Sequence, residues 1–411
     1  MRISLCLFLG CLLSAAESST SETVRAEFVR SLASSPAVQS AHERIVAAHA
    51  AERASGRLPD PTVGGGYARK SITGSDWPIY DLSLEQALPR WGERDALRAR
   101  AAADVGMSEA ELLDSIGEAA AEVASMLADG LAARAELALV EREIARVDTL
   151  RRAVMARVAV GTGNLAEDLG LQTRQASLTI EHASLQRQID DAEQDVRSLL
   201  ALPQTSPLPP FCAPDRNSLA LGHVSDRVPG MVIAKSKHAA ADADFRTARA
   251  SRYPETAIGL RYEHESEPGN TSDMIGLEFR VSLPVWQGAS GNLEDAAAAR
   301  SRAAIKESLG WYHRAAAMVS RAERAAAVAA SARKAAEETR VRIDAEYDAV
   351  IRDVATENGS TVSVVLSVLD RLSEAEGRVI AAEAAARQAE AGLWRLAPPD
   401  VATIIHDRTQ P

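Results

Sequence analysis

The sequence has few aromatic residues for its length. Of its 411 residues only 4% are Phe, Trp or Tyr, while long stretches are dominated by Ala, Leu, Val, Glu and Arg. A chain of this length is large enough to bury a core. Its composition, however, is that of long helices and coiled coils rather than of a mixed globular enzyme.

Positive charge and catalytic motifs are also missing. The formal net charge is −11, and no basic stripe runs along the chain, so the sequence excludes a nucleic-acid partner. Its eight histidines are scattered, and we find no HExxH motif, no paired cysteines, no phosphate loop and no nucleophile elbow. We therefore expect no enzyme activity, no cofactor and no metal site.

Cysteine is rare, and its distribution depends on how the N-terminus is processed. Residues 1–16 have one Arg, an apolar run over residues 3–13 and the small residues Ser14-Ala15-Ala16, a pattern that predicts a secretory signal peptide. Cleavage after Ala16 would leave Cys212 as the only cysteine, which excludes an intrachain disulfide. The alternative is a lipoprotein acylated on Cys11.

No segment after the signal peptide approaches the run of about 18 apolar residues that a membrane-spanning helix requires. If the chain crosses a membrane, it must therefore do so with strands.

The sequence repeats itself. Residues 58–70 have a counterpart in residues 252–265, and residues 79–92 have one in residues 274–288, with a Leu-Pro-x-Trp pattern at one constant offset. Each copy has a helical stretch, two strands and two long helices, which predicts a duplicated unit. The expected parts are a signal peptide (1–16), a first repeat (17–201), a Pro-rich linker (202–225), a second repeat (226–397) and a tail (398–411). The first repeat is expected to have a helical stretch at 22–56, strands at 61–70 and 79–88, and helices at 94–158 and 164–201. The second is expected to have a helical stretch at 226–252, strands at 254–264 and 273–283, and helices at 293–357 and 361–396.

The strands alternate between apolar and polar residues. Such alternation over segments of about ten residues is typical of strands in a transmembrane barrel, with the apolar side chains toward lipid. A soluble antiparallel sheet with one wet face is the alternative, but aromatic residues near the strand ends favour a membrane interface. The first strand alternates poorly because three glycines interrupt it. The residues expected to face lipid are Leu82, Leu84, Ile275, Leu277, Phe279 and Val281.

Four strands cannot close a barrel, and an open sheet edge is prohibitively costly in lipid. The chain must therefore oligomerise. Two copies would give eight strands and an interior filled by side chains, whereas three would give twelve strands and an aqueous lumen. The charged residues on the other face favour three copies. Each of the first long helices would extend for about 100 Å, and such helices must pack laterally into a bundle that continues the barrel.

With this duplicated organisation, the chain resembles the TolC-like outer-membrane efflux protein family over nearly all of its mature length. The resemblance implies a homotrimer with a twelve-stranded outer-membrane barrel and a periplasmic α-helical barrel. It also implies a channel of a tripartite efflux or type I secretion system, whose partners are outer-membrane lipid, a periplasmic adaptor and an inner-membrane transporter. The exported compound would be a small molecule or metal ion that the transporter delivers.

Two turns between long helices carry the family's short motifs. Val160, Gly161 and Thr162 resemble its Val-Gly-Thr turn at the periplasmic end, which implies that adaptor hairpins dock there. The second turn keeps Gly359 and Ser360 but lacks the triplet, which puts the second docking surface in doubt. Plain turns that only reverse the chain are the alternative for both.

Two acidic residues follow the turns at similar spacings. In the family, acidic residues at the places of Asp168 and Asp370 line the constricted periplasmic aperture or join the hydrogen bonds that hold it closed. A ring of carboxylates facing a pore would attract cations. The alternative for each is a solvated helix face.

Three other hypotheses stay open. His264 and its acidic neighbours in residues 263–267 could bind a metal, but a charged extracellular loop explains them better, because such a local cluster lacks a fixed second shell. A periplasmic adaptor would also have a signal peptide and long helical hairpins, but only one hairpin flanked by β-rich domains. A coiled-coil scaffold would explain the helices and leave the four matched strands unexplained.

Overall fold

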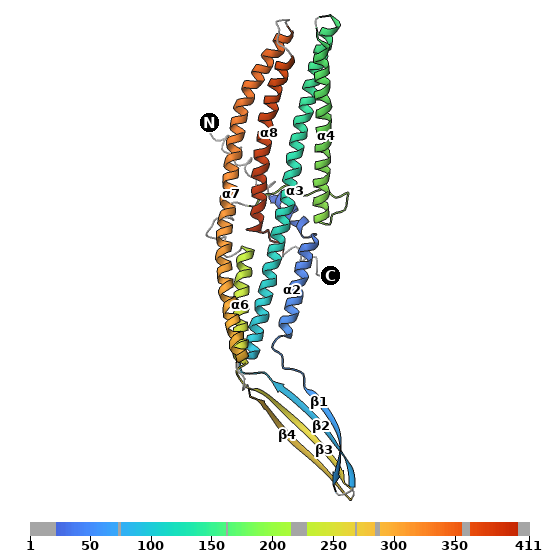
Figure 1. The fold of residues 1–411 in the computed structure, drawn as a ribbon, viewed down its shortest axis with the longest axis vertical. Coiled ribbons are helices and arrows are strands. Elements are labelled where there is room, and N and C mark those ends of the chain that lie inside the picture. The colour runs from blue at the N-terminus through green and yellow to red at the C-terminus, as the bar shows by residue number, and fades with distance from the viewer. Residues whose placement is uncertain are drawn as a thin grey trace, which may run out of the picture. The chain divides into compact units, whose positions relative to one another are not determined.

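The computed structural model describes residues 22–72, 75–161, 163–214, 228–267, 269–283, 288–355 and 362–401. It is mostly helical with one four-stranded sheet, and the helix, hairpin and helix-pair order occurs twice, as the sequence predicted (Figure 1). The elements of the first copy are α2 (Pro36–Ala54), β1 (Thr62–Ile72), β2 (Ser75–Leu88), α3 (Glu93–Ala159) and α4 (Leu165–Leu199). Those of the second are α6 (Pro229–Ala250), β3 (Glu255–Glu267), β4 (Asn270–Ser282), α7 (Gly288–Ala355), α8 (Val362–Gly392) and the 3₁₀ turn η2 (Leu393–Arg395).

The chain forms two compact units. We call the first the hairpin unit; it consists of Met1–Ala41, Leu113–Pro229 and Tyr312–Pro411. The second, the sheet unit, consists of His42–Leu112 and Gly230–Trp311.

The N-terminal helical stretch differs from the single helix expected over residues 22–56. Residues 22–32 are helical, the helix stops, and α2 begins at Pro36. Proline lacks the N–H that a continuing helix needs and disfavours helical geometry in the residue before it, but it suits the first position of a new helix. Pro36 therefore divides the stretch into two helices.

In the sheet unit, the strands lie in the order β1-β2-β3-β4 and every neighbouring pair is antiparallel. Leu84 lies opposite Val63 on one side and Leu260 on the other, and Leu260 lies opposite Leu277. Since residues opposite one another share a face of the sheet, this register collects the alternating apolar residues of all four strands on one face.

Helices α3 and α7 each belong to both units, and their segments in the sheet unit end at Leu112 and Trp311. Within the sheet unit, these segments and α6 are joined by ion pairs and by close backbone contact. Arg100 on α3 donates two hydrogen bonds of 2.6 and 2.7 Å to Asp244 on α6, and Arg300 on α7 lies 3.6 Å from the same carboxylate. A Cβ on Gly230 would lie 2.4 Å from the ring of Trp311. A side chain there would overlap the indole, so α6 and α7 can approach this closely only because residue 230 is glycine.

Helices α3 and α4 form an antiparallel hairpin with a seven-residue repeat. The apolar core of the hairpin unit includes Val140, Val147 and Val154 of α3 and Leu171, Leu178 and Leu185 of α4. A period of seven places these side chains along one seam, as in a coiled coil. Helix α8 adds Val362, Val365 and Leu369 to the same core.

The end of α7 and the start of α8 lie at the same end of the hairpin unit as the turn between α3 and α4 (Figure 1). Helix α7 packs in this unit mainly through small side chains, since its buried residues among those with described side chains are Ala315, Ala322, Ala329 and Ile343. Of these four, Ile343 alone is large, and it packs with Val368 and Leu372 of α8. The second hairpin therefore has a thinner apolar seam than the first.

At the other end of the hairpin unit, Trp394 contacts Phe28 and Cys212, and we call this group the belt. The Trp394 ring is fully buried and stacks on Phe28 at a centroid distance of 5.6 Å, while its Nε1–H donates to the backbone carbonyl of Cys212 at 3.0 Å. Cys212 lies in the Pro-rich segment after α4, of which residues 202–214 are non-helical. Burial raises the pKa of the Cys212 thiol, although the charge of Arg25 opposes this effect.

Candidate functional site

One face of the sheet is apolar and exposed in the single chain. Leu277 is 70% exposed and Phe279 is 74% exposed, and all six residues expected to face lipid lie on this face. A contiguous apolar surface of this kind marks a membrane or protein interface. It comprises Val63, Leu82, Leu84, Ile258, Leu260, Ile275, Leu277, Phe279 and Val281.

The apolar face ends in a polar row that runs across all four strands. Tyr67 lies opposite Tyr80, Tyr80 opposite His264, and His264 opposite Asp273. The Tyr67 and Tyr80 rings lie 5.4 Å apart, and Asp273 Oδ1 lies 2.7 Å from both His264 Nδ1 and the hydroxyl of Tyr262, which donates to it. Rows of Tyr and Trp are typical of the border between hydrocarbon and headgroups.

The opposite face of the sheet is charged, and its ion pairs span three strands. Lys70 on β1 donates to Glu265 on β3 at 2.8 Å, and Arg280 on β4 donates to Glu85 on β2 at 2.8 Å. Each of these pairs passes over an intervening strand. The alternation of the sequence predicts the charged face, whereas these pairs depend on the register of nonadjacent strands.

The glycines of β1 have a specific place in this face. A Cβ on Gly64 would lie 2.7 Å from Ser83 Oγ, and one on Gly66 would lie 2.1 Å from Asp81 Oδ1. The side chains of β2 therefore lean over β1, and the glycines leave room for them.

The sheet has two open edges. Within the part of the chain that the structure describes, β1 pairs only with β2 and β4 only with β3. Unpaired edges expose backbone N–H and C=O groups, which favour pairing with another chain.

At the first tip, Gly161 has a φ of +83°. A glycine adopts this conformation without strain, whereas an L side chain rarely does. The neighbouring Val160 is 80% exposed, and the side chain of Asn164 accepts a 3.0 Å hydrogen bond from the Ala166 N–H, which caps α4. Nothing lies within 4 Å of the position of a Gly161 Cβ, so the tip is open to a partner.

The tip has more exposed apolar residues than the motif indicated. Met155, Leu165 and Leu169 are exposed beside Val160. Thr162, Gly359 and Ser360 lie outside the described residues, so the second tip can be followed only from Val362 on.

Asp168 is buried inside the first hairpin. Its Oδ1 accepts a 2.9 Å hydrogen bond from Arg151 Nε on α3, and its Oδ2 accepts a 2.6 Å bond from Gln172 Nε2. Only 3% of Asp168 is exposed in the single chain. This placement favours a role in hydrogen bonds that hold the helices together over a side chain that lines an opening.

Asp370 is exposed and joins α8 to the first hairpin. Arg174 on α4 donates to Asp370 Oδ1 at 3.0 Å and also to buried Glu143 on α3, which accepts a 3.1 Å bond from Ser373 on α8. One guanidinium thus links three helices. Partial burial acts to lower the pKa of Arg174. The hydrogen bond with Glu143 and the charges of Glu143, Asp370 and Glu181 outweigh this effect, so the pKa lies above its usual value.

Arg151, Glu143 and Arg174 belong to none of the motifs in the sequence. A signal for them exists, because Arg151 and Asp168 lie 8 and 9 positions on either side of Ala159, where α3 ends, and Glu143 and Arg174 lie 16 and 15 positions on either side of it. An antiparallel hairpin brings such positions together. Reflecting the sequence about the turn would have paired them.

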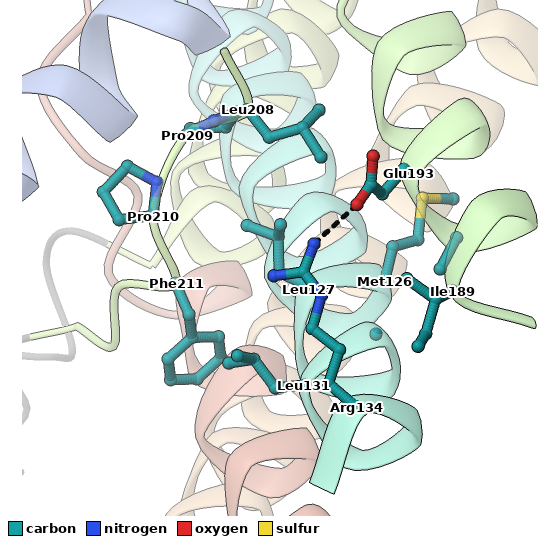
Figure 2. Close-up of a pocket in the computed structure, with 12 residues that line it drawn as sticks. Met126, Leu127, Leu131, Arg134, Ile189, Glu193, Leu208, Pro209, Pro210 and Phe211 are labelled. Atoms are coloured by element: carbon teal, nitrogen blue, oxygen red, sulfur yellow. Dashed lines mark hydrogen bonds and ion pairs between the residues drawn. The ribbon is translucent and has the colours of Figure 1, made fainter. Parts of the chain in front are cut away.

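A groove lies between α3 and the C-terminal part of α4, where the Pro-rich segment passes the two helices (Figure 2). Its volume is about 200 Å³, and Leu131, Leu208 and Phe211 are among its lining residues. Arg134 on α3 donates a 2.5 Å hydrogen bond to Glu193 on α4 at its side. The ion pair satisfies both charges, so the groove offers no free ionic group from this pair.

Two further features bear on the expectations from sequence. Among the described residues, no group of three His, Cys, Asp or Glu side chains is arranged to hold a metal ion, and His264 is bound to Asp273. The helices that the structure describes include none with the length and apolar character needed to cross a membrane.

Comparisons with known proteins agree with the architecture. Residues 29–202 match the sequence model of the outer membrane efflux protein family. No curated protein sequence matches the chain.

The fold matches those of solved bacterial membrane proteins. It is similar to the outer membrane protein VceC of Vibrio cholerae, with a TM-score of 0.76, 16% identity, and coverage of 92% of this chain and 96% of that one. It is also similar to a membrane protein of Pseudomonas aeruginosa, with a TM-score of 0.73, 19% identity and coverage of 91% and 93%. For the MtrE outer membrane channel of Neisseria gonorrhoeae, the corresponding values are 0.66, 16%, 92% and 89%.

Proposed function

We propose that this protein is the outer-membrane channel of a tripartite efflux or type I secretion system, because it has the fold of solved outer membrane channels and residues 29–202 match the model of the outer membrane efflux protein family. The observation that carries the proposal is the sheet, with one exposed apolar face, one charged face and two open edges. In the alternative functions, a periplasmic adaptor or a coiled-coil scaffold, such a sheet would have no role.

Three copies would close the sheet. The β1 edge of one copy would pair with the β4 edge of the next, giving twelve strands and no free edge. The apolar face would then contact lipid, and the charged face would line a water-filled lumen.

The apolar band has the height that a membrane barrel needs. The exposed apolar residues of this band extend from Leu283, just after β4, to Ile275, and the polar Asp273 marks its end. From Leu283 to Ile275, a rise of about 3.4 Å per residue and a tilt of about 40° give a height of about 21 Å, close to the band of about 25 Å in an outer-membrane barrel. This agreement supports lipid contact at Ile275, Leu277, Phe279 and Val281, and at Leu82 and Leu84 beside them.

The helix tips supply the docking surface for a periplasmic adaptor. Val160 and Gly161 are exposed at the first tip, and the apolar side chains of Met155, Leu165 and Leu169 surround them. An exposed apolar patch on a helical turn fits an apolar surface of another helical hairpin. Thr162, Gly359 and Ser360 belong to the same proposal. An inner-membrane transporter would deliver the exported molecule to the adaptor.

The aperture would be held by the contacts of Arg174. Asp370 is the exposed member of the network that links α8 to α3 and α4, and Asp168 holds α3 to α4 about two turns nearer the tip. Opening would require α8 to separate from the first hairpin, which breaks the Arg174–Asp370 bond.

Reconstitution tests the channel function. The protein, purified in detergent, should have the mass of a trimer by light scattering and form water-filled pores in planar bilayers. In cells that lack it, the gene should restore export together with its adaptor and transporter. A monomer that stays in solution without detergent and conducts no ions would exclude the channel and favour the scaffold.

A further inference from the structure

The charged face of the sheet has more acidic than basic side chains. The described cations on this face are Lys70, Arg261 and Arg280, and the carboxylates are Asp81, Glu85, Glu255, Glu263, Glu265 and Glu278. If the face lines a lumen, the wall is therefore negative in each copy.

Each cation on the wall is already neutralised by a carboxylate. Lys70 binds Glu265 at 2.8 Å, and Arg280 binds Glu85 at 2.8 Å. Arg261 lies 3.4 Å from Glu278 and 3.8 Å from Glu263.

Small residues allow one of these pairs to lie flat on the wall. Arg280 reaches Glu85 across β3, where Ala257 faces Arg280 and Gly259 faces Glu85 in the register. No large side chain stands between the two partners. The guanidinium therefore lies along the wall, where its charge is cancelled, instead of projecting into the lumen.

Asp81 is the carboxylate of this face that forms no ion pair among the described residues. Glu255 lies 3.2 Å from Arg90, and Glu263 and Glu278 share Arg261. Asp81 lies directly opposite Glu263. Its carboxylate leans over Gly66, whose Cβ would overlap Asp81 Oδ1, and Gly64 and Gly66 leave the β1 wall bare beside it. Nothing on β1 therefore shields this charge from the lumen.

We propose that the lumen of the barrel prefers cations over anions and that Asp81 sets this preference. The inference rests on the proposed function, since it requires three copies to close the barrel. Twelve strands about 4.8 Å apart and tilted by about 40° give a radius of about 12 Å. The Debye length at physiological salt is about 8 Å, so the field of three Asp81 residues reaches most of the lumen. Cationic solutes are then the class that passes this segment most easily.

Reversal potentials in planar bilayers test the proposal. Under a KCl gradient, channels of the full-length protein should show a reversal potential on the potassium side, and the potential should approach zero as salt is raised. Asp81→Asn should move it toward zero, whereas Asp81→Glu should retain it. The double variant Glu85→Gln/Arg280→Gln removes a neutral pair from the same face and should leave the potential unchanged.

The outcomes separate this inference from the channel function. Absence of any conductance from a trimer would overturn both. A conducting wild-type channel without cation preference, or one whose preference survives Asp81→Asn, would leave the channel function standing and overturn the role of Asp81. The variants should first show the wild-type amount of trimer, which confirms that the sheet has formed.

Discussion

Arg174 on α4 and Asp370 on α8 are 196 positions apart in the sequence, and a 3.0 Å hydrogen bond joins their side chains. The bond connects the two repeats near the tips of their hairpins. Asp370 is 60% exposed, whereas Glu143, the other partner of Arg174, is buried. Loss of the bond to Glu143 should therefore cost more folding free energy than loss of the bond to Asp370.

Asp370→Asn should open the channel at little cost in stability. An exposed ion pair contributes about 1 kcal/mol or less, so the free energy of unfolding should hardly change, while single-channel conductance should rise. Arg174→Ala should also raise conductance but should cost about 3 kcal/mol or more, because it leaves Glu143 buried without its cation. Glu374→Gln is a matched control, since Glu374 pairs with Arg378 within α8. Equal conductance in all three variants would exclude Arg174–Asp370 as a contact that limits opening.

Arginine on the apolar face of β4 should impair assembly. Leu277→Arg and Phe279→Arg should each cost about 2 to 4 kcal/mol if the side chains face lipid near the midplane. Glu278→Gln, between them on the charged face, should leave the trimer intact. The yield of heat-modifiable trimer in outer-membrane fractions measures the effect. Equal tolerance at the three positions would show that the alternation is not a membrane pattern.

Gly161→Val should abolish export while the trimer still forms. The positive φ of Gly161 strains any L side chain, and a branched one would also obstruct an adaptor at the open tip. Export assays at matched protein levels give the primary measurement. Adaptor variants with an enlarged receiving surface should restore export if the defect is steric, and full export by Gly161→Val would remove the docking role.

Gly117→Ala should destabilise the hairpin unit, whereas Gly130→Ala should not. A Cβ on Gly117 would lie 2.9 Å from the backbone carbonyl of Trp394, which cannot move without disturbing the belt. We expect a loss of about 1 to 3 kcal/mol. A Cβ on Gly130, on the same helix, would make an ordinary 3.7 Å contact with Ala192, so alanine should stabilise α3 by up to about 1 kcal/mol. Thermal unfolding of the two variants in detergent should separate them.

Glu193 should make the stability of the first hairpin depend on pH. Partial burial acts to raise the pKa of Glu193. Its hydrogen bonds and charge interactions with Arg134 and Arg197 outweigh this effect, so the pKa lies below its usual value. The ionised carboxylate therefore stabilises the folded state above the unfolded pKa of about 4.3. This contribution is lost as pH falls through the lowered pKa of the folded state. The difference in unfolding free energy between wild type and Glu193→Gln should be largest above about pH 5 and should vanish in stronger acid. A difference that is constant with pH would exclude an ionic contribution.

The sequence by itself determined the elements and their duplication. Alternation in residues such as Leu277, Glu278 and Phe279 specifies a strand with two unlike faces, because successive side chains point to opposite sides. Long stretches rich in Ala, Glu and Arg and free of proline specify the long helices. Both signals are local, so they can be read without knowing what packs against them. The break before Pro36 is also a local signal, because proline disfavours helical geometry in the residue before it.

Only the tertiary structure decided which charges meet between different strands and between the two repeats. Asp168 could be predicted as a candidate, yet its burial against Arg151 follows from the antiparallel path of α3 and α4. The Arg174–Asp370 bond requires the two repeats to pack on one another, and the Arg280–Glu85 pair requires the register of three strands. Charged side chains are common along this chain, and nothing in their local sequence distinguishes a solvated one from a paired one. Their partners come from distant segments, so the contacts follow from packing and register and not from any local pattern.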